Sequence, residues 1–106
     1  MMGVNTSPFA CRCSERLASA VNELIRSGGA EDKSDAAQII IAGFLQRPTF
    51  YSKLDIQVLR EPLTKMFTTT VQQQLLAKLS DFAHENGCSV SEAFRMAVFQ
   101  ELIVNG

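Results

Sequence analysis

Four side chains of this sequence have the chemistry of metal ligands. Two are cysteines separated by one residue, Cys11 and Cys13, and the others are His84 and Cys88. A structural zinc site needs four such ligands, so zinc binding is the first chemistry to consider. The spacing matches no standard zinc pattern, however, and cysteines on the inward face of a strand pack as small apolar side chains. We therefore expect no metal ion and no cofactor.

The sequence carries none of the usual patterns of catalysis. It contains no glycine-rich phosphate loop, no pair of carboxylates spaced for general acid–base chemistry and no nucleophile motif. His84 is the single histidine and has no serine or aspartate at a recognisable catalytic spacing. We expect that the chain is not an enzyme and has no catalytic residue.

Length and charge narrow the classes of function. The chain has 106 residues, 46% of them hydrophobic, which is typical of one globular domain. Ten basic residues against eleven acidic ones give a net charge of −1, so any contact with nucleic acid must be local. Three cysteines are too few for a disulfide framework, residues 1–13 lack a signal-peptide pattern, and the apolar run 39–45 is too short for a bilayer. These features predict a cytoplasmic protein with no membrane contact.

The sequence contains an internal repeat. The segment FACRCSERL at 9–17 aligns with FTTTVQQQL at 67–75 at an offset of 58, and Ser34–Ala37 aligns with Ser91–Phe94 at an offset of 57. Each copy is expected to form a short strand, a helix, a glycine turn and a second helix.

Alternation predicts the two strands. Residues 66–71 are rich in β-branched side chains and alternate with a period of two, and residues 8–13 alternate in the same way. Because proline lacks a backbone donor, the first strand is expected to begin at Pro8.

Apolar periodicity predicts four helices. The first helix of each copy, over about 15–27 and 72–86, has one apolar stripe; Ser14 is the expected N-cap of one, and Gly28-Gly29 and Asn86-Gly87 are the expected stops. The second helices, within 36–45 and 93–103, are apolar nearly all round and must be covered on several sides. The two copies are therefore expected to fold into each other, with Ser34 and either Ser89 or Ser91 capping the second helices.

This pattern predicts a mainly α-helical domain with a short two-stranded antiparallel ribbon. Its units are residues 8–47 and 64–104, joined by the linker 48–63, in which residues 54–59 are expected to form a helical turn or two. The two units are expected to form one intertwined domain.

The repeat resembles the ribbon-helix-helix (Arc/MetJ-type) DNA-binding family. The resemblance covers both copies and is clearer in the second, where AHENGCSVSEA at 83–93 is similar to the family's turn between helices. The first copy departs from the pattern by a second glycine and an inserted residue. Two units on one chain imply a tandem pseudo-dimer, a layout similar to that of conjugation proteins of the TraY type.

The resemblance implies how such a chain binds double-stranded DNA. In the family, an antiparallel ribbon enters the major groove, which here assigns base reading to outward strand positions: Pro8, Ala10, Arg12, Met66, Thr68 and Thr70. Arg12 suits guanine O6 and N7, and threonine suits base acceptors or a thymine methyl. The starts of the second helices clamp phosphates in the family, which implies contacts from Lys33, Ser34, Lys65, Ser89 and Ser91, weakly opposed by Asp35 and Glu92.

The expected role is that of a transcriptional repressor or a plasmid or conjugation accessory factor, with self-association of copies on adjacent DNA sites. The alternative is a protein-interaction module of the same fold, antitoxin-like or an assembly adaptor, that docks a partner through the linker 48–63. Each feature also has a plainer interpretation: threonines that simply favour a strand, a solvated Arg12, serines that only cap helices, and a linker packed on its own domain. DNA binding would weaken steeply with salt, whereas an apolar partner contact would not.

Overall fold

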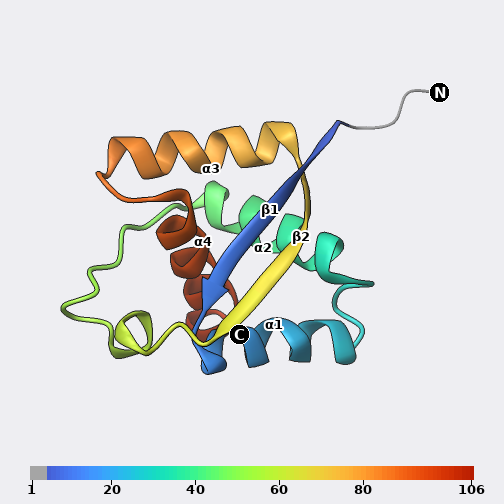
Figure 1. Cartoon of the computed structure of the whole chain (residues 1–106), viewed down its shortest axis with the longest axis horizontal. Coiled ribbons are helices and arrows are strands. Elements are labelled where there is room, and N and C mark those ends of the chain that lie inside the picture. The colour runs from blue at the N-terminus through green and yellow to red at the C-terminus, as the bar shows by residue number, and fades with distance from the viewer. Residues whose placement is uncertain (1–4) are drawn as a thin grey trace.

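A computed structural model describes residues 5–106 as two consecutive strand-helix-helix units (Figure 1). The first unit contains β1 (Thr6–Cys13), α1 (Glu15–Arg26) and α2 (Lys33–Gln46), and the second contains β2 (Lys65–Gln72), α3 (Gln73–Glu85) and α4 (Val90–Val98). A 3-10 helix, η1 (Gln57–Arg60), lies in the linker, and α4 continues into a π-helix, η2 (Phe99–Val104). The predicted mainly helical fold with one two-stranded ribbon is confirmed. Within residues 5–106, no helix has both the length and the apolar character that a membrane span requires.

The two strands pair as an antiparallel ribbon, from Thr6 opposite Gln72 to Cys13 opposite Lys65. The predicted start at Pro8 is wrong, because β1 begins two residues earlier and Pro8 pairs with Thr70. Each strand of a two-stranded ribbon has one edge without a partner strand. A proline is tolerated in such a strand where its nitrogen faces that edge.

The first helix of each unit begins and ends close to the predicted residues. The Ser14 Oγ accepts a hydrogen bond from the Leu17 N–H at 3.2 Å, which confirms the expected N-cap of α1. Gly28, after α1, and Gly87, after α3, have φ angles of +88° and +68°. Glycine adopts this left-handed backbone without a side-chain clash, so both glycine turns end their helices as expected.

The second helices pack crosswise between the units. Helix α2 of the first unit contacts β2 and α3 of the second, while α4 of the second contacts β1 and α1 of the first. Figure 1 shows the ribbon crossing over α2 and α4, with α1 and α3 along opposite sides of the molecule. This arrangement covers both second helices on several sides.

An aromatic cluster packs against the inward face of the ribbon. Phe94 of α4 is fully buried and packs edge-on against Phe9 of β1, with ring centroids 5.0 Å apart. The Phe67 ring of β2 stacks on the same Phe94 ring at 5.4 Å. One side chain of α4 therefore fixes both strands.

Part of the linker packs on its own domain. Val58 and Leu59 are buried in η1, which starts later than the helical turn expected over 54–59. Two surface ion pairs hold the linker at its sides: Arg16 with Glu61 at 2.6 Å, and Lys53 with Glu92 at 2.5 Å.

The π-helix η2 is joined to the linker by a buried amide. The Gln100 side chain donates from Nε2 to the Arg47 carbonyl at 3.0 Å and accepts from the Tyr51 hydroxyl at 2.9 Å. The Tyr51 ring also packs edge-on against Phe99, 5.1 Å between centroids. These contacts fix the path of the chain as it leaves α2.

Candidate nucleic-acid interface

The outward face of the ribbon is exposed from Thr6 to Arg12 in β1 and from Met66 to Thr70 in β2. Exposed and buried residues alternate in both strands, as the period of two predicts, apart from a half-buried Ser7, Thr69 and Gln72 and an exposed Lys65. The exposed set includes all the residues predicted to read bases, namely Pro8, Ala10, Arg12, Met66, Thr68 and Thr70. Whether these side chains contact DNA stays a prediction.

The strand register gives this face an approximate two-fold symmetry. Ala10 lies directly opposite Thr68, and the repeat offset of 58 relates the same two residues. The pseudo-symmetry axis therefore passes through this pair. Arg12 lies opposite Met66 at one end of the ribbon, and Thr70 lies opposite Pro8 at the other. The two ends are related in backbone but differ in chemistry.

Each end of the ribbon is held by a donor from the crosswise second helix. At the first end, the Arg95 Nη1 of α4 donates to the Arg12 carbonyl at 2.7 Å. At the other end, the Ser34 Oγ of α2 donates to the Thr70 carbonyl at 2.8 Å. Arg12 and Thr70 are equivalent under the offset of 58, so different side chains hold equivalent ribbon carbonyls.

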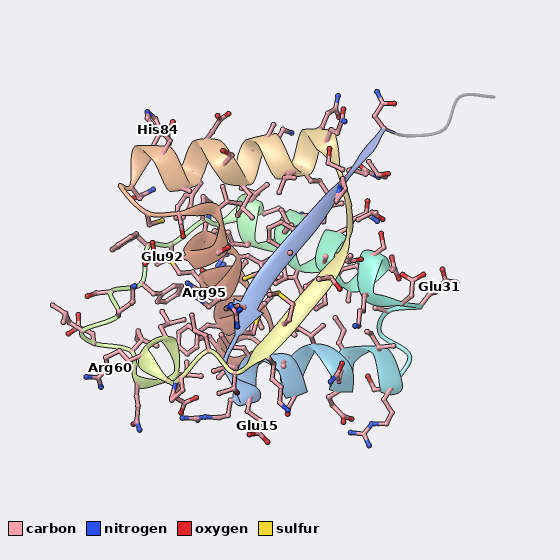
Figure 2. All side chains as sticks on the ribbon, in the orientation of Figure 1. Glu15, Glu31, Arg60, His84, Glu92 and Arg95 are labelled. Atoms are coloured by element: carbon pink, nitrogen blue, oxygen red, sulfur yellow. The ribbon has the colours of Figure 1, made fainter. Side chains whose placement is uncertain are left out.

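Arg95 was not among the predicted site residues. It lies beside β1 on the inner side of the ribbon, close to the end that carries Arg12 (Figure 2). The signal that could have identified it is a lone basic residue within an otherwise apolar stretch of helix, between Phe94 and Met96. Arg12 forms no ion pair with any of residues 5–106, so its guanidinium is free to bind an outside acceptor.

The start of α2 differs from the prediction. Its N-cap is Asp32, whose Oδ1 accepts from the Asp35 N–H at 2.8 Å, and the expected Ser34 cap is wrong. The Asp35 Oδ2 in turn accepts from the Glu31 N–H at 2.9 Å. The Asp32 carboxylate is stabilised by the free amides at the positive helix end, and the Ser34 hydroxyl donates to the Thr70 carbonyl instead. Lys33 is exposed beside these carboxylates.

The start of α4 is capped by Ser89. The Ser89 Oγ accepts from the Glu92 N–H at 3.0 Å, and the Glu92 carboxylate accepts from the Ser89 N–H at 2.9 Å. The Lys53 ammonium and the Ser89 N–H lower the pKa of Glu92 to about 2. A carboxylate thus occupies the position where an incoming phosphate would be placed, as at α2.

The remaining predicted phosphate ligands are spread over both ends of the ribbon. Lys65 is exposed in β2 opposite Cys13, at the end that carries Arg12. The Ser91 carbonyl lies 3.6 Å from the Cys11 sulfur, which places Ser91 at the same end. Lys33 and Ser34 lie at the other end, beside Thr70. Phosphate binding by these residues stays a prediction.

Two of the cysteines, Cys11 and Cys13, lie on the inward face of the ribbon. Cys11 and Cys13 are buried, and Arg95 Nη1 lies 3.7 Å from the Cys11 sulfur. The hydrogen bond with Cys13 and the charge of Arg95 lower the pKa of Cys11, while the same hydrogen bond and burial raise the pKa of Cys13. In the described part of the chain, no three His, Cys, Asp or Glu side chains gather where they could hold a metal ion.

Comparison with known protein families, with curated proteins and with solved structures finds no match to this chain.

Proposed function

We propose that the chain is a tandem ribbon-helix-helix protein that binds double-stranded DNA and reads a short sequence in the major groove, as a transcriptional repressor or a plasmid or conjugation accessory factor. The observation that carries this proposal is the exposed antiparallel ribbon, built from one strand of each unit and supported by the second helices. A two-stranded ribbon fits the width of the major groove.

The chemistry of the exposed face supports recognition of an asymmetric site. Arg12 offers two parallel donors to guanine O6 and N7, while the hydroxyl and methyl groups of Thr68 and Thr70 suit base acceptors and a thymine methyl. Because Arg12 lies opposite Met66 and Thr70 lies opposite Pro8, the two ends of the ribbon read different bases. The expected DNA site is therefore not a palindrome.

Phosphate contacts are expected to contribute little to this binding. Asp32 and Asp35 lie at the start of α2, and Glu92 lies at the start of α4, so both helix ends repel a phosphate. Two of the predicted phosphate ligands are basic, Lys33 and Lys65, and both are exposed. The logarithm of affinity should then fall with the logarithm of salt concentration at a slope of about −2 to −4 in B-DNA, which corresponds to a few phosphate contacts.

The test is selection of bound sequences from a random duplex library at low salt. The native protein is compared with Arg12→Ala and with Arg26→Ala, whose arginine lies at the far end of α1 and pairs with Glu23. We expect one asymmetric motif for the native protein and for Arg26→Ala. Arg12→Ala should lose preference at one base pair, which corresponds to about 1–3 kcal/mol of discrimination.

A second candidate function is a protein-interaction module of the same fold. The carboxylates at the starts of α2 and α4 favour it, and so do Phe50 and Leu54, which the linker leaves exposed. This function predicts that folded protein enriches no sequence from the library. That result would refute sequence-specific DNA binding, and the linker would then be the surface to test for a protein partner.

A further inference from the structure

The two second helices are equivalent in the repeat but are covered differently. The linker lies along the outer side of α4, where Lys53 pairs with Glu92 at 2.5 Å and Tyr51 packs on Phe99. Leu59 of the linker and Met96 of α4 line the same small cavity. As a result Met96 is only 2% exposed.

The equivalent side of α2 lacks such a cover. The offset of 57 relates Glu92 to Asp35 and Met96 to Ile39. Ile39 is 44% exposed, whereas Met96 at the equivalent position of α4 is buried. Asp35 forms no ion pair with any of residues 5–106. The outer face of α2 therefore repeats the chemistry that binds the linker on α4, an acidic side chain followed by an apolar one.

The linker exposes groups that complement this face. Leu54 and Phe50 are 83% and 47% exposed, respectively. In the segment 47–63, Lys53 is paired with Glu92 and Glu61 with Arg16. Its other charged residues are Arg47, Arg60 and Asp55, a net charge of +1, whereas the segment 31–35 before and at the start of α2 has a net charge of −2. The two regions lie at opposite ends of the molecule: the linker extends to one side in Figure 1, and Glu31 is labelled at the far side in Figure 2. One copy cannot bring its own linker tip to its own α2 face.

We propose that the outer face of α2 binds the linker tip of a second copy of this chain, with Leu54 and Phe50 packed near Ile39. The contact joins two different surfaces, so it is head-to-tail and repeats from copy to copy, as a ring if the rotation closes and as an open row if it does not. A patch of this size gives a weak contact between free molecules. The contact becomes effective when copies are held side by side. It requires no DNA and is independent of the proposed function.

The test is sedimentation equilibrium of the full chain without DNA, from about 20 µM to about 1 mM, a range that brackets weak affinities. We expect the weight-average mass of the native protein to rise above the 11.7 kDa of one chain at low salt and to rise less at high salt. Leu54→Ser removes an apolar side chain of the linker tip, and Ile39→Ser removes the apolar side chain of the α2 face. Each variant alone should stay at the mass of one chain. Ile103→Ser, a change of another exposed apolar residue on η2, is the matched control and should associate like the native protein.

Mixing the two variants distinguishes a head-to-tail contact from a symmetric one. In the mixture, Ile39→Ser supplies an intact tip and Leu54→Ser supplies an intact α2 face, so association should return but stop at a 1:1 pair. The proposal is overturned if the native protein stays at the mass of one chain up to the highest concentration, if either variant associates like the native protein, or if the mixture does not recover. None of these outcomes bears on DNA binding, which the library selection tests separately.

Discussion

The asymmetric aromatic cluster under the ribbon allows a test of the repeat as a physical symmetry. Phe94 is fully buried between Phe9 and Phe67, whereas the residue that the offset of 57 places at the same position in α2 is Ala37, also fully buried. Phe9 and Phe67 are themselves related by the offset of 58. If the backbone is symmetric here, a ring at position 37 meets the same two strand rings from the other side.

The double variant Ala37→Phe/Phe94→Ala moves the ring from α4 to α2 while conserving core volume. Phe94→Ala alone should cost about 3–5 kcal/mol of unfolding free energy, because it leaves a cavity and removes two ring contacts. Ala37→Phe alone should cost about 1–3 kcal/mol through overpacking. Independent effects would add to about 4–8 kcal/mol, close to the whole stability of a small domain. We expect instead that the double variant is more stable than Phe94→Ala, which requires a favourable coupling larger than the cost of Ala37→Phe, toward the upper end of the range of about 0.5–3 kcal/mol for residues in contact.

Urea unfolding monitored by far-ultraviolet circular dichroism measures all four proteins. Phe94→Leu, which keeps an apolar side chain at the site, provides a folded reference if Phe94→Ala is largely unfolded in the absence of urea. A coupling near zero, or a double variant less stable than Phe94→Ala, would refute the reasoning, because positions 37 and 94 would then not share one space beneath the ribbon.

Three further predictions concern contacts that hold the ribbon and the turns. Arg95→Met removes a charge-assisted hydrogen bond to the Arg12 carbonyl and should lower the free energy of unfolding in urea by about 1.5–3 kcal/mol. Ser34→Ala removes a neutral hydrogen bond to the Thr70 carbonyl and should lower it by about 0.5–1.5 kcal/mol. Equal losses of unfolding free energy would contradict this ranking. The folded-state pKa of Glu92 is about 2, below its ordinary 4.5, so its stabilising contribution is present above pH 4.5 and is lost as the pH falls toward 2. In Glu92→Gln, the melting temperature should therefore change less with pH between 4.5 and 2 than in the native protein. An unchanged profile would argue against the ion pair between Glu92 and Lys53. In Gly87→Ala, the added Cβ contacts no neighbouring atom, but the backbone φ of +68° is strained for alanine. The melting temperature should fall by about 4–8 °C for each kcal/mol of this strain, and Gly87→Asn should recover part of the loss.

The sequence predicts the fold well because the repeat is visible in residue types. Alternation defines both strands, and glycine ends both first helices, since each signal depends on neighbouring residues alone. The crosswise packing could also be predicted, because helices as apolar as α2 and α4 must be covered on several sides.

The details that sequence reasoning missed depend on contacts between distant residues or on close competition. Ser34 and Asp32 both suit an N-cap, and only the three-dimensional position of Thr70 decides that the Ser34 hydroxyl is used on the ribbon. Arg95 reaches the Arg12 carbonyl across 83 positions of sequence, a distance that no local pattern reports. The outward positions of the candidate site follow from alternation, whereas the carboxylates beside it become apparent only once the helix ends are placed.

The pairing of β1 with β2 has a consequence for how the protein is made. During synthesis the first unit is complete before β2 has been made. The apolar side chains of α2 that pack on β2, α3 and α4 therefore stay exposed until those elements are synthesised. At translation rates of about 5–20 residues per second, the roughly sixty residues still to come take about 3–12 s. Strand pairing over such a separation is also slow to form. The ribbon is therefore among the last surfaces to appear, and a prematurely terminated chain would expose an aggregation-prone helix pair without the ribbon. A chain that ends before β2 cannot form the outward face.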